Sequence, residues 1–418
     1  MNKNKFIHVN FSSWTFSDWS LNWIIFFSIF YQKLVPIGFL FWIIFSYKDW
    51  KLQTIKSFFK TIYTTPGFWF LLYYLLLVVG MTWTDNIEFG FSKLENKLSF
   101  VLLPILLVST RLNSALGDWK NTFISALVIS VIFYEIMATI HTLNSTHTSP
   151  YFYFRESNFT LFMHRSYFAC YLVIGFILIL EKLWDAWSYL GTALLCLFFI
   201  AIFQTFSKAG IGSFMIIIVL FAIFKLYKKS IYSAFTVIGL VLFSSFFILS
   251  FENLLSLRFK NMIDAIENTP LRNNHSVESN ASRILMWSAS AEVVKENPMF
   301  GVGTGDYDDA LANKNKKFNN TGVYKERLNS HSQFLNTWVQ LGFIGFGLLA
   351  MMFIVPMTGS YSIYKILILI TFFLNFLFES FLETQAGIIL FCLFFMLLFS
   401  PKSVFNNVRL EEIRSDED

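Results

Sequence analysis

Long apolar runs separated by short polar breaks dominate the pattern of hydrophobic and polar positions along the chain. A helix needs about 20 apolar residues to cross a bilayer, with a usual range of about 17–25. Twelve runs predict transmembrane helices on this basis, although the fourth, sixth and eleventh are short and must include flanking polar residues. They lie at 14–31, 33–47, 66–83, 98–110, 120–140, 167–180, 189–206, 209–226, 231–250, 333–354, 363–378 and 384–400.

This pattern predicts an all-α polytopic membrane protein with about twelve transmembrane helices. We expect a membrane domain of about nine helices at 1–250 and a long loop at 251–332. A second membrane domain of about three helices follows at 333–400, and a tail occupies 401–418. The long loop is expected to carry amphipathic helices.

Composition supports the membrane assignment. Hydrophobic residues make up 55% of the 418 positions and charged residues only 14%, whereas a soluble domain is about a quarter charged. This balance excludes a water-soluble enzyme, and the high hydrophobicity excludes a disordered chain.

The distribution of positive charge predicts the orientation. With twelve spans, sixteen of the 32 Lys and Arg residues fall on the side of the N-terminus and six in the short loops of the other side. Cytoplasmic loops carry the excess of Lys and Arg. Both termini are therefore expected in the cytoplasm and the long loop outside it.

Polar candidates for chemistry lie at span ends and in the long loop, since Glu135 is the main ionisable residue within the spans. Ser207-Lys208-Ala209-Gly210 is wedged between two apolar runs, which holds Lys208 at the outer membrane surface. Two interpretations remain open. Lys208 is either a lysine that extends from apolar surroundings to water or a cation fixed near phosphate groups.

The second candidate is Arg283 in the long loop. Ser282 can cap a helix of about fifteen residues that ends at Asn297-Pro298. Arg283 would then lie in the first turn, where a cation opposes the helix dipole and favours a nearby anion. The anion is either a phosphate ligand or a carboxylate such as Glu278. The apolar face of this helix is predicted to consist of Ile284, Trp287, Ala291 and Val294.

The third candidate is His331 at the entry to the tenth span. Asn329 or Ser330 is expected to cap this helix, which places His331 in its first turn. The positive end of the helix dipole lowers the pKa of a histidine and favours a neutral imidazole that can accept a proton. A histidine that only forms a structural hydrogen bond is the alternative interpretation.

Further polar residues are less informative. The glycine-rich segment 301–305 follows a predicted helix end rather than a strand, so we interpret it as a tight turn and not as a nucleotide-binding loop. Arg155, His164 and Arg165 could add positive charge to an outer site. Glu379 and Glu383 flank the last outer turn, either as an exposed pair or as partners of a cation.

The order of these motifs resembles the O-antigen ligase family and the superfamily that it shares with O-antigen polymerases. The motifs are Thr205–Gly210 at the end of a span, Ser282–Trp287 and Asn297–Gly305 in the long loop, and His331–Leu335 at the start of a span that continues with Gly342–Gly345. The tail Glu379–Gly387 also looks like members of that group.

The resemblance implies a metal-independent and cofactor-free inverting glycosyl transfer on a GT-C-like fold, at the periplasmic face of the bacterial inner membrane. The implied donor is a glycan on undecaprenyl pyrophosphate, and the implied acceptor is a lipid A–core sugar. The family's functional residues map onto Lys208, Arg283 and His331, with Arg155, Arg165 and His164 as further candidates for substrate binding. Arg is usual where this chain has Lys208, and lysine lacks the bidentate fork.

Alternative functions remain open from the sequence. A polymerase of the same superfamily would bind the same donor, although a single outer loop with one Arg and one His favours a ligase. A transferase with a protein acceptor is possible within the same resemblance. A non-catalytic transporter of lipid or polysaccharide would be expected to carry polar residues in mid-membrane. No nucleic-acid partner is expected.

Overall fold

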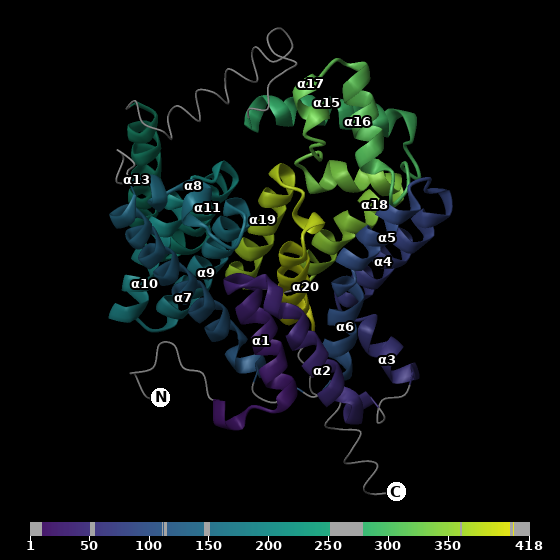
Figure 1. The fold of residues 1–418 in the computed structure, drawn as a ribbon. Helices are drawn as coiled ribbons and strands as arrows, with labels where there is room; N and C mark the ends of the chain where they lie inside the picture. Colours follow the sequence, from purple (N-terminus) through teal and green to yellow (C-terminus); the bar gives the residue numbers. More distant parts are fainter. Residues whose placement is uncertain are drawn as a thin grey trace, which may run out of the picture.

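A computed structural model describes residues 11–50, 55–110, 112, 115–145, 151–250, 279–359, 362–401 and 404. The described part of the chain is all helical and contains no strand (Figure 1). The predicted all-α class is therefore confirmed. The N-terminal ten residues, the segment 251–278 of the long loop and most of the tail lie outside the described residues.

The helices of the first 250 residues are α1 (Phe16–Phe30), α2 (Val35–Trp50), α3 (Ile55–Ile62), α4 (Gly67–Gly80), α5 (Ile87–Asn96), α6 (Ser99–Ser109), α7 (Ala115–Asn144), α8 (Glu156–Phe159), α9 (Arg165–Asp185), α10 (Tyr189–Gln204), α11 (Lys208–Phe221), α12 (Tyr227–Lys229) and α13 (Ile231–Ser250). The later helices are α15 (Ser279–Glu296), α16 (Tyr307–Lys317), α17 (Thr321–Lys325), α18 (Gln333–Met357), α19 (Ile363–Phe378) and α20 (Gln385–Phe399). Short 3₁₀ turns include η3 (Met81–Trp83), which extends α4, and η6 (Phe381–Glu383), which lies between α19 and α20.

Each of the twelve predicted spans coincides with a helix. The helices are α1, α2, α4, α6, α7, α9, α10, α11, α13, α18, α19 and α20. Four helical segments are long and apolar enough to cross a membrane: Asp118–Asn144, Arg165–Asp185, Lys208–Lys229 and Gln333–Met357. Six shorter apolar helices accompany them. The chain is thus a helical membrane protein, while the number of crossings stays a prediction.

Two apolar helices lie at the centre of the bundle. Every residue of α9 from Ser166 to Ile179 is buried, and α20 is buried without interruption from Ala386 to Met396. A helix that is hydrophobic on all sides lies either within a protein core or in contact with lipid, and the burial of α9 and α20 places both within the core of the bundle. Helices α7, α10, α11 and α19 pack around α9, and α6, α4 and α1 pack against α20 (Figure 1).

Helices α15, α16 and α17 lie together at one end of the bundle, at the top of Figure 1. We call this the loop end. A small apolar cluster joins these helices to the start of α18; its buried members are Leu285, Met286, Val293, Tyr307, Leu311, Val323 and Val339.

The position of α15 corrects two sequence predictions. The helix begins at Ser279, so Ser282 lies in its first turn and does not cap it, although the predicted end before Asn297 is confirmed. The predicted apolar face was also wrong, since Ala291 is exposed. The residues that are buried most deeply are Ser282, Met286, Ala289, Ser290 and Val293. The reason is that α15 is packed against both α16 and α18 and does not lie alone on a membrane surface.

The glycine-rich segment forms the predicted turn and docks on a kink in α18. Val302 and Gly303 donate their backbone N–H groups to the carbonyl groups of Val339 and Gln340, at 2.9 and 3.0 Å. Gly342 has φ +66°, and a Cβ atom there would lie 2.2 Å from the carbonyl carbon of Met299. Only glycine fits this close approach and this backbone conformation, so the turn fixes the outer part of α18 relative to α15.

Candidate active site

A cavity of about 230 Å³ opens at the loop end, where several helices begin. Its lining comes from the start of α9, the α10–α11 junction, α15, the segment before α18 and the α19–α20 connection; the residues are His164, Arg165, Ser166, Phe206, Ser207, Lys208, Ala209, Ser282, Arg283, Leu328, His331 and Glu379. Within the residues that the structure describes, no group of three His, Cys, Asp or Glu side chains could hold a metal ion.

The cavity brings together five of the six candidates. Lys208, Arg283 and His331 lie far apart in sequence and line one space, as do Arg165 and His164. Arg155 does not line the cavity; it is half-buried just before α8. Arg165 pairs with Glu156, with 3.1 Å between Nη1 and Oε2. The structure therefore supplies a shared location, while the roles of these residues stay predictions.

Helix starts make the cavity favourable for anions. Helix α9 begins at Arg165, α11 begins at Lys208, and α15 begins one turn before Arg283. The free N–H groups and the positive dipole end at a helix N-terminus attract negative charge. The starts of α9 and α11 line the cavity together with three cationic side chains, and this combination fits a ligand that carries several negative charges.

Arg283 pairs with a carboxylate inside the cavity. Its Nη2 atom lies 2.8 Å from Oε1 of Glu379, and the hydroxyl of Ser166 donates to the same oxygen at 2.9 Å. Only 8% of the Glu379 side chain is exposed. The sequence did not distinguish an exposed glutamate pair from partners of a cation, and the structure decides for the second. Glu278, the local partner considered above, lies outside the described residues.

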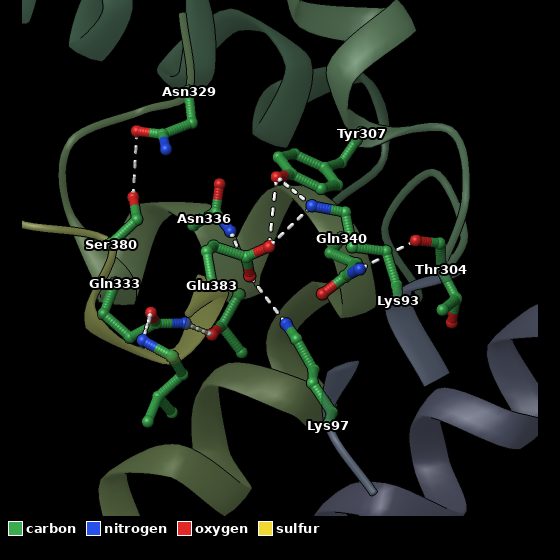
Figure 2. A network of polar contacts seen from close by, with 12 residues as sticks. Lys93, Lys97, Thr304, Tyr307, Asn329, Gln333, Asn336, Gln340, Ser380 and Glu383 are labelled. Atoms are coloured by element: carbon green, nitrogen blue, oxygen red, sulfur yellow. Dashed lines mark hydrogen bonds and ion pairs between the residues drawn. The ribbon is translucent and has the colours of Figure 1, made fainter. Parts of the chain in front are cut away.

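His331 has a different local structure from the one predicted. Helix α18 begins at Gln333 with Ser332 as its N-cap, so His331 precedes the helix and has φ +47°. Its backbone N–H donates to Oδ1 of Asn329 at 2.9 Å. The hydroxyl of Ser380 donates to the same Asn329 oxygen at 3.2 Å (Figure 2). These bonds tie the His331 segment to the α19–α20 connection and explain how a left-handed backbone is maintained there.

The predicted direction of the His331 pKa is confirmed, but its main cause is different. Burial lowers the pKa of His331 below its ordinary value, and Arg283 and His164 lower it further, whereas Glu379 opposes them. The helix start was the expected cause. A neutral imidazole at pH 7 follows from this environment.

Comparison with known proteins gives independent information on this region. Residues 192–350 match the family described as O-antigen ligase. The chain carries an O-antigen ligase domain. The predicted resemblance is thus confirmed, and Lys208, Arg283 and His331 all lie within the matched residues.

A curated relative adds little to this assignment. A stretch of 89 residues is 32% identical to a protein of Haemophilus influenzae that is described as uncharacterized. The similarity covers 21% of this chain and 22% of the relative, so the chain matches only about a fifth of that protein's length. No activity follows from this match.

The O-antigen ligase domain supplies only part of the cavity. His164, Arg165, Ser166 and Glu379 line it from outside the matched residues. Glu379 therefore contributes the carboxylate that holds the domain's Arg283. The complete site requires helices from both sides of the matched region.

A buried ionic cluster anchors the domain near the cavity (Figure 2). Glu383 accepts from Lys93 at 2.9 Å and from Lys97 at 2.6 Å, and it also accepts from Asn336 at 3.0 Å and from the Tyr307 hydroxyl at 3.2 Å. Only 7% of the Glu383 side chain and 1% of the Lys97 side chain are exposed. Burial opposes ionisation of Glu383, but Lys97 and Lys93 outweigh it and lower the pKa of its carboxyl to about 2.

This ionic cluster was missed by sequence reasoning. In the sequence analysis, Lys93 and Lys97 are two of the six positive charges counted in the short outer loops. No specific partner was assigned to Glu383. The available signal was the rarity of charge in this apolar chain, together with the spacing of Lys93 and Lys97 on one helical face. That spacing does not identify a partner 286 residues away.

Proposed function

We propose that this protein transfers a glycan from undecaprenyl pyrophosphate to a lipid A–core acceptor at the periplasmic face of the inner membrane. The observation that carries this proposal is the cavity that joins Lys208, Arg283 and His331 at the starts of α9 and α11. The O-antigen ligase domain supports the reaction class. The excess of Lys and Arg on the opposite side supports the periplasmic location.

In the proposed reaction, an acceptor hydroxyl oxygen attacks the anomeric carbon of the donor glycan. The bond between that carbon and the diphosphate oxygen breaks, and the diphosphate leaves with the electron pair. The hydroxyl proton passes to neutral His331. A single displacement of this kind inverts the anomeric configuration.

Arg283 and Lys208 would bind the diphosphate and offset the charge that develops on it. Fixed cations are effective in such a role because they need no reorganisation as the bond breaks. Arg283 can bind two oxygens through its planar guanidinium, whereas Lys208 acts as a point charge. Glu379 holds the Arg283 side chain at the cavity before the donor arrives.

The lipid profile of a deletion strain tests the proposed function. Without this protein, we expect lipid A–core that lacks the transferred glycan, together with accumulated lipid-linked glycan, because the donor has no acceptor reaction. The measurement is electrophoresis of lipopolysaccharide with mass spectrometry of the polyprenyl fraction. Core that carries one repeat unit would identify a polymerase instead, and an unchanged profile would contradict both functions.

The pH dependence tests the role of His331. Its pKa is lowered, so the neutral base is the dominant form at pH 7. The transfer rate should be constant through neutral pH and fall only as the pH drops through a value below the ordinary His pKa of about 6.5. Initial rates of the purified protein between about pH 5 and 8 measure this.

A matched variant identifies the group that titrates. His331→Gln should be slower and should lose the acid limb of the profile, while Glu379, Arg283 and His164 remain around the position. The same acid limb in His331→Gln would assign it to another group. A wild-type rate that already declines from pH 8 to pH 7 would contradict a neutral base.

A further inference from the structure

His164 is the second histidine at the cavity. A hydrogen bond at the start of α9 determines which of its two ring nitrogens carries the hydrogen. The side chain accepts a hydrogen bond from the backbone N–H of Ser166, with 3.4 Å between N and Nδ1. A ring nitrogen that accepts an N–H carries no hydrogen itself. In a neutral ring, the hydrogen of His164 therefore lies on Nε2.

The surroundings of His164 favour this neutral ring. Desolvation lowers its pKa, and the nearby Arg165 and Arg283 act in the same direction, whereas Glu379 opposes them. His331 lies near enough to interact with His164 electrostatically. We therefore expect a neutral imidazole here rather than the added positive charge that the sequence indicated.

The Nε2–H group of His164 is available to a ligand. The described residues provide no hydrogen-bond acceptor for Nε2, and the side chain is accessible at the cavity. Its ring packs edge to face on Tyr167 with 5.6 Å between centroids, which restricts its movement. An oriented N–H donor at a cavity lined with cations is suited to an anionic oxygen.

We propose that His164 donates a hydrogen bond from Nε2 to the anionic leaving group of the transfer reaction. This inference rests on the proposed function and adds a second histidine to it. His164 keeps its proton throughout, and the electron pair of the broken bond stays on the diphosphate oxygen that His164 helps to stabilise. His331 alone accepts the proton of the acceptor hydroxyl. The two neutral rings thus have opposite roles, one as donor and one as base.

Three substitutions of His164 separate a donor from a helix cap. Glutamine retains an amide N–H donor of similar reach, asparagine is a better N-cap but shorter, and phenylalanine keeps the ring contact with Tyr167 without a donor. We expect His164→Gln to retain most of kcat. His164→Asn and His164→Phe should lose about tenfold to a hundredfold in kcat, the effect of one hydrogen bond to a charged group. The opposite order, with asparagine active and glutamine impaired, would show that capping is the only role.

Binding of inorganic pyrophosphate provides a second test of the His164 proposal that does not depend on glycan transfer. Calorimetry on the purified full-length protein in lipid nanodiscs should give weaker binding for His164→Asn and His164→Phe than for His164→Gln. If the wild-type protein fails to transfer glycan but the binding order holds, the proposed function is wrong and the donor role stands. If the wild type transfers glycan and all three variants match it in both assays, the donor role alone is wrong.

Nitrogen NMR of the wild-type protein tests the protonation state without any dependence on variant folding. The chain has six histidines, and the His164 signals are those that disappear in His164→Gln. We expect hydrogen on Nε2 and none on Nδ1 at pH 7. A ring with hydrogen on Nδ1, or on both nitrogens, would overturn the proposal.

Discussion

Replacing Arg283 with alanine is expected to abolish detectable glycan transfer while the protein remains in the membrane. Arg283 lines the cavity, with 18% of its side chain exposed and an ion pair to Glu379. Removing one fixed donor from an anion-stabilising site costs about a hundredfold to a thousandfold in kcat. A full charge is also lost here, so the expected decrease is at the upper end of this range or beyond.

Electrostatic repulsion adds to this effect. Without Arg283, Ser166 is the remaining side chain among the described residues that donates to the Glu379 carboxylate, and this negative charge faces the arriving diphosphate. Changing Glu379 to glutamine in the Arg283→Ala background should therefore restore part of donor binding but not kcat. Transfer is measured in membranes that contain equal amounts of each variant.

The loop end offers a matched control for Arg283. Arg327 also pairs with a carboxylate, Asp309, at 3.1 Å, but it is exposed and does not line the cavity. Arg327→Ala should transfer glycan at the wild-type rate. Transfer that survives in Arg283→Ala, or that is lost equally in both variants, would remove Arg283 from the site.

Replacing Glu383 with alanine is expected to destabilise the protein more than any other single change considered for this chain. The substitution would leave Lys93 and Lys97 without the carboxylate that both contact, and Lys97 is almost completely buried. Breaking a buried ion pair by removing one partner costs about 3–5 kcal/mol. Thermal unfolding in detergent and the amount of folded protein in membranes measure the loss.

An exposed ion pair again provides the control. Arg327→Ala removes one partner of the exposed pair with Asp309 and should change stability by about 1 kcal/mol or less. Replacing Lys93, Lys97 and Glu383 together with apolar residues should recover much of the loss, because no unpaired charge remains buried. A Glu383→Ala protein as stable as Arg327→Ala would show that water reaches the two lysines.

The cluster around Glu383 also explains how the cavity is positioned. The backbone N–H of Leu382 donates to Gln333 at 2.7 Å, and Glu383 accepts from Asn336 on the same helix (Figure 2). The α19–α20 connection is thus fixed to α18 next to His331, and it carries Glu379 to Arg283. A change at Glu383 should therefore reduce transfer through loss of structure.

Local sequence information was sufficient for the helices and for the candidates at their ends. The apolar runs predicted twelve of the helices, because a segment long and apolar enough for a membrane helix is recognised from its own residues alone. Lys208 and Arg283 were identified because cations are rare next to apolar runs and in the first turn of a helix. The motif order around them indicated the O-antigen ligase family.

Predictions of local structure were wrong where contacts with distant segments determine the conformation. The predicted helix start placed His331 in the first turn of the helix. In the structure, the His331 backbone N–H and the Ser380 hydroxyl both donate to Asn329, and His331 lies before the helix with φ +47°. The apolar face of α15 was misassigned because α16 and α18 cover it from two sides. The residues of α15 and of the His331 segment do not by themselves indicate which helices pack against them.

The sequence by itself determined that this chain is a bundle of apolar helices with a few cations and histidines at their ends. Only the tertiary structure decided which charges meet: Arg283 with Glu379, and Glu383 with Lys93 and Lys97. These partners are separated by 96, 290 and 286 positions. A periodic pattern reports only neighbours on one helix, whereas the packing of α5, α15, α18 and the α19–α20 connection brings distant charges together in a medium where an unpaired charge is unfavourable.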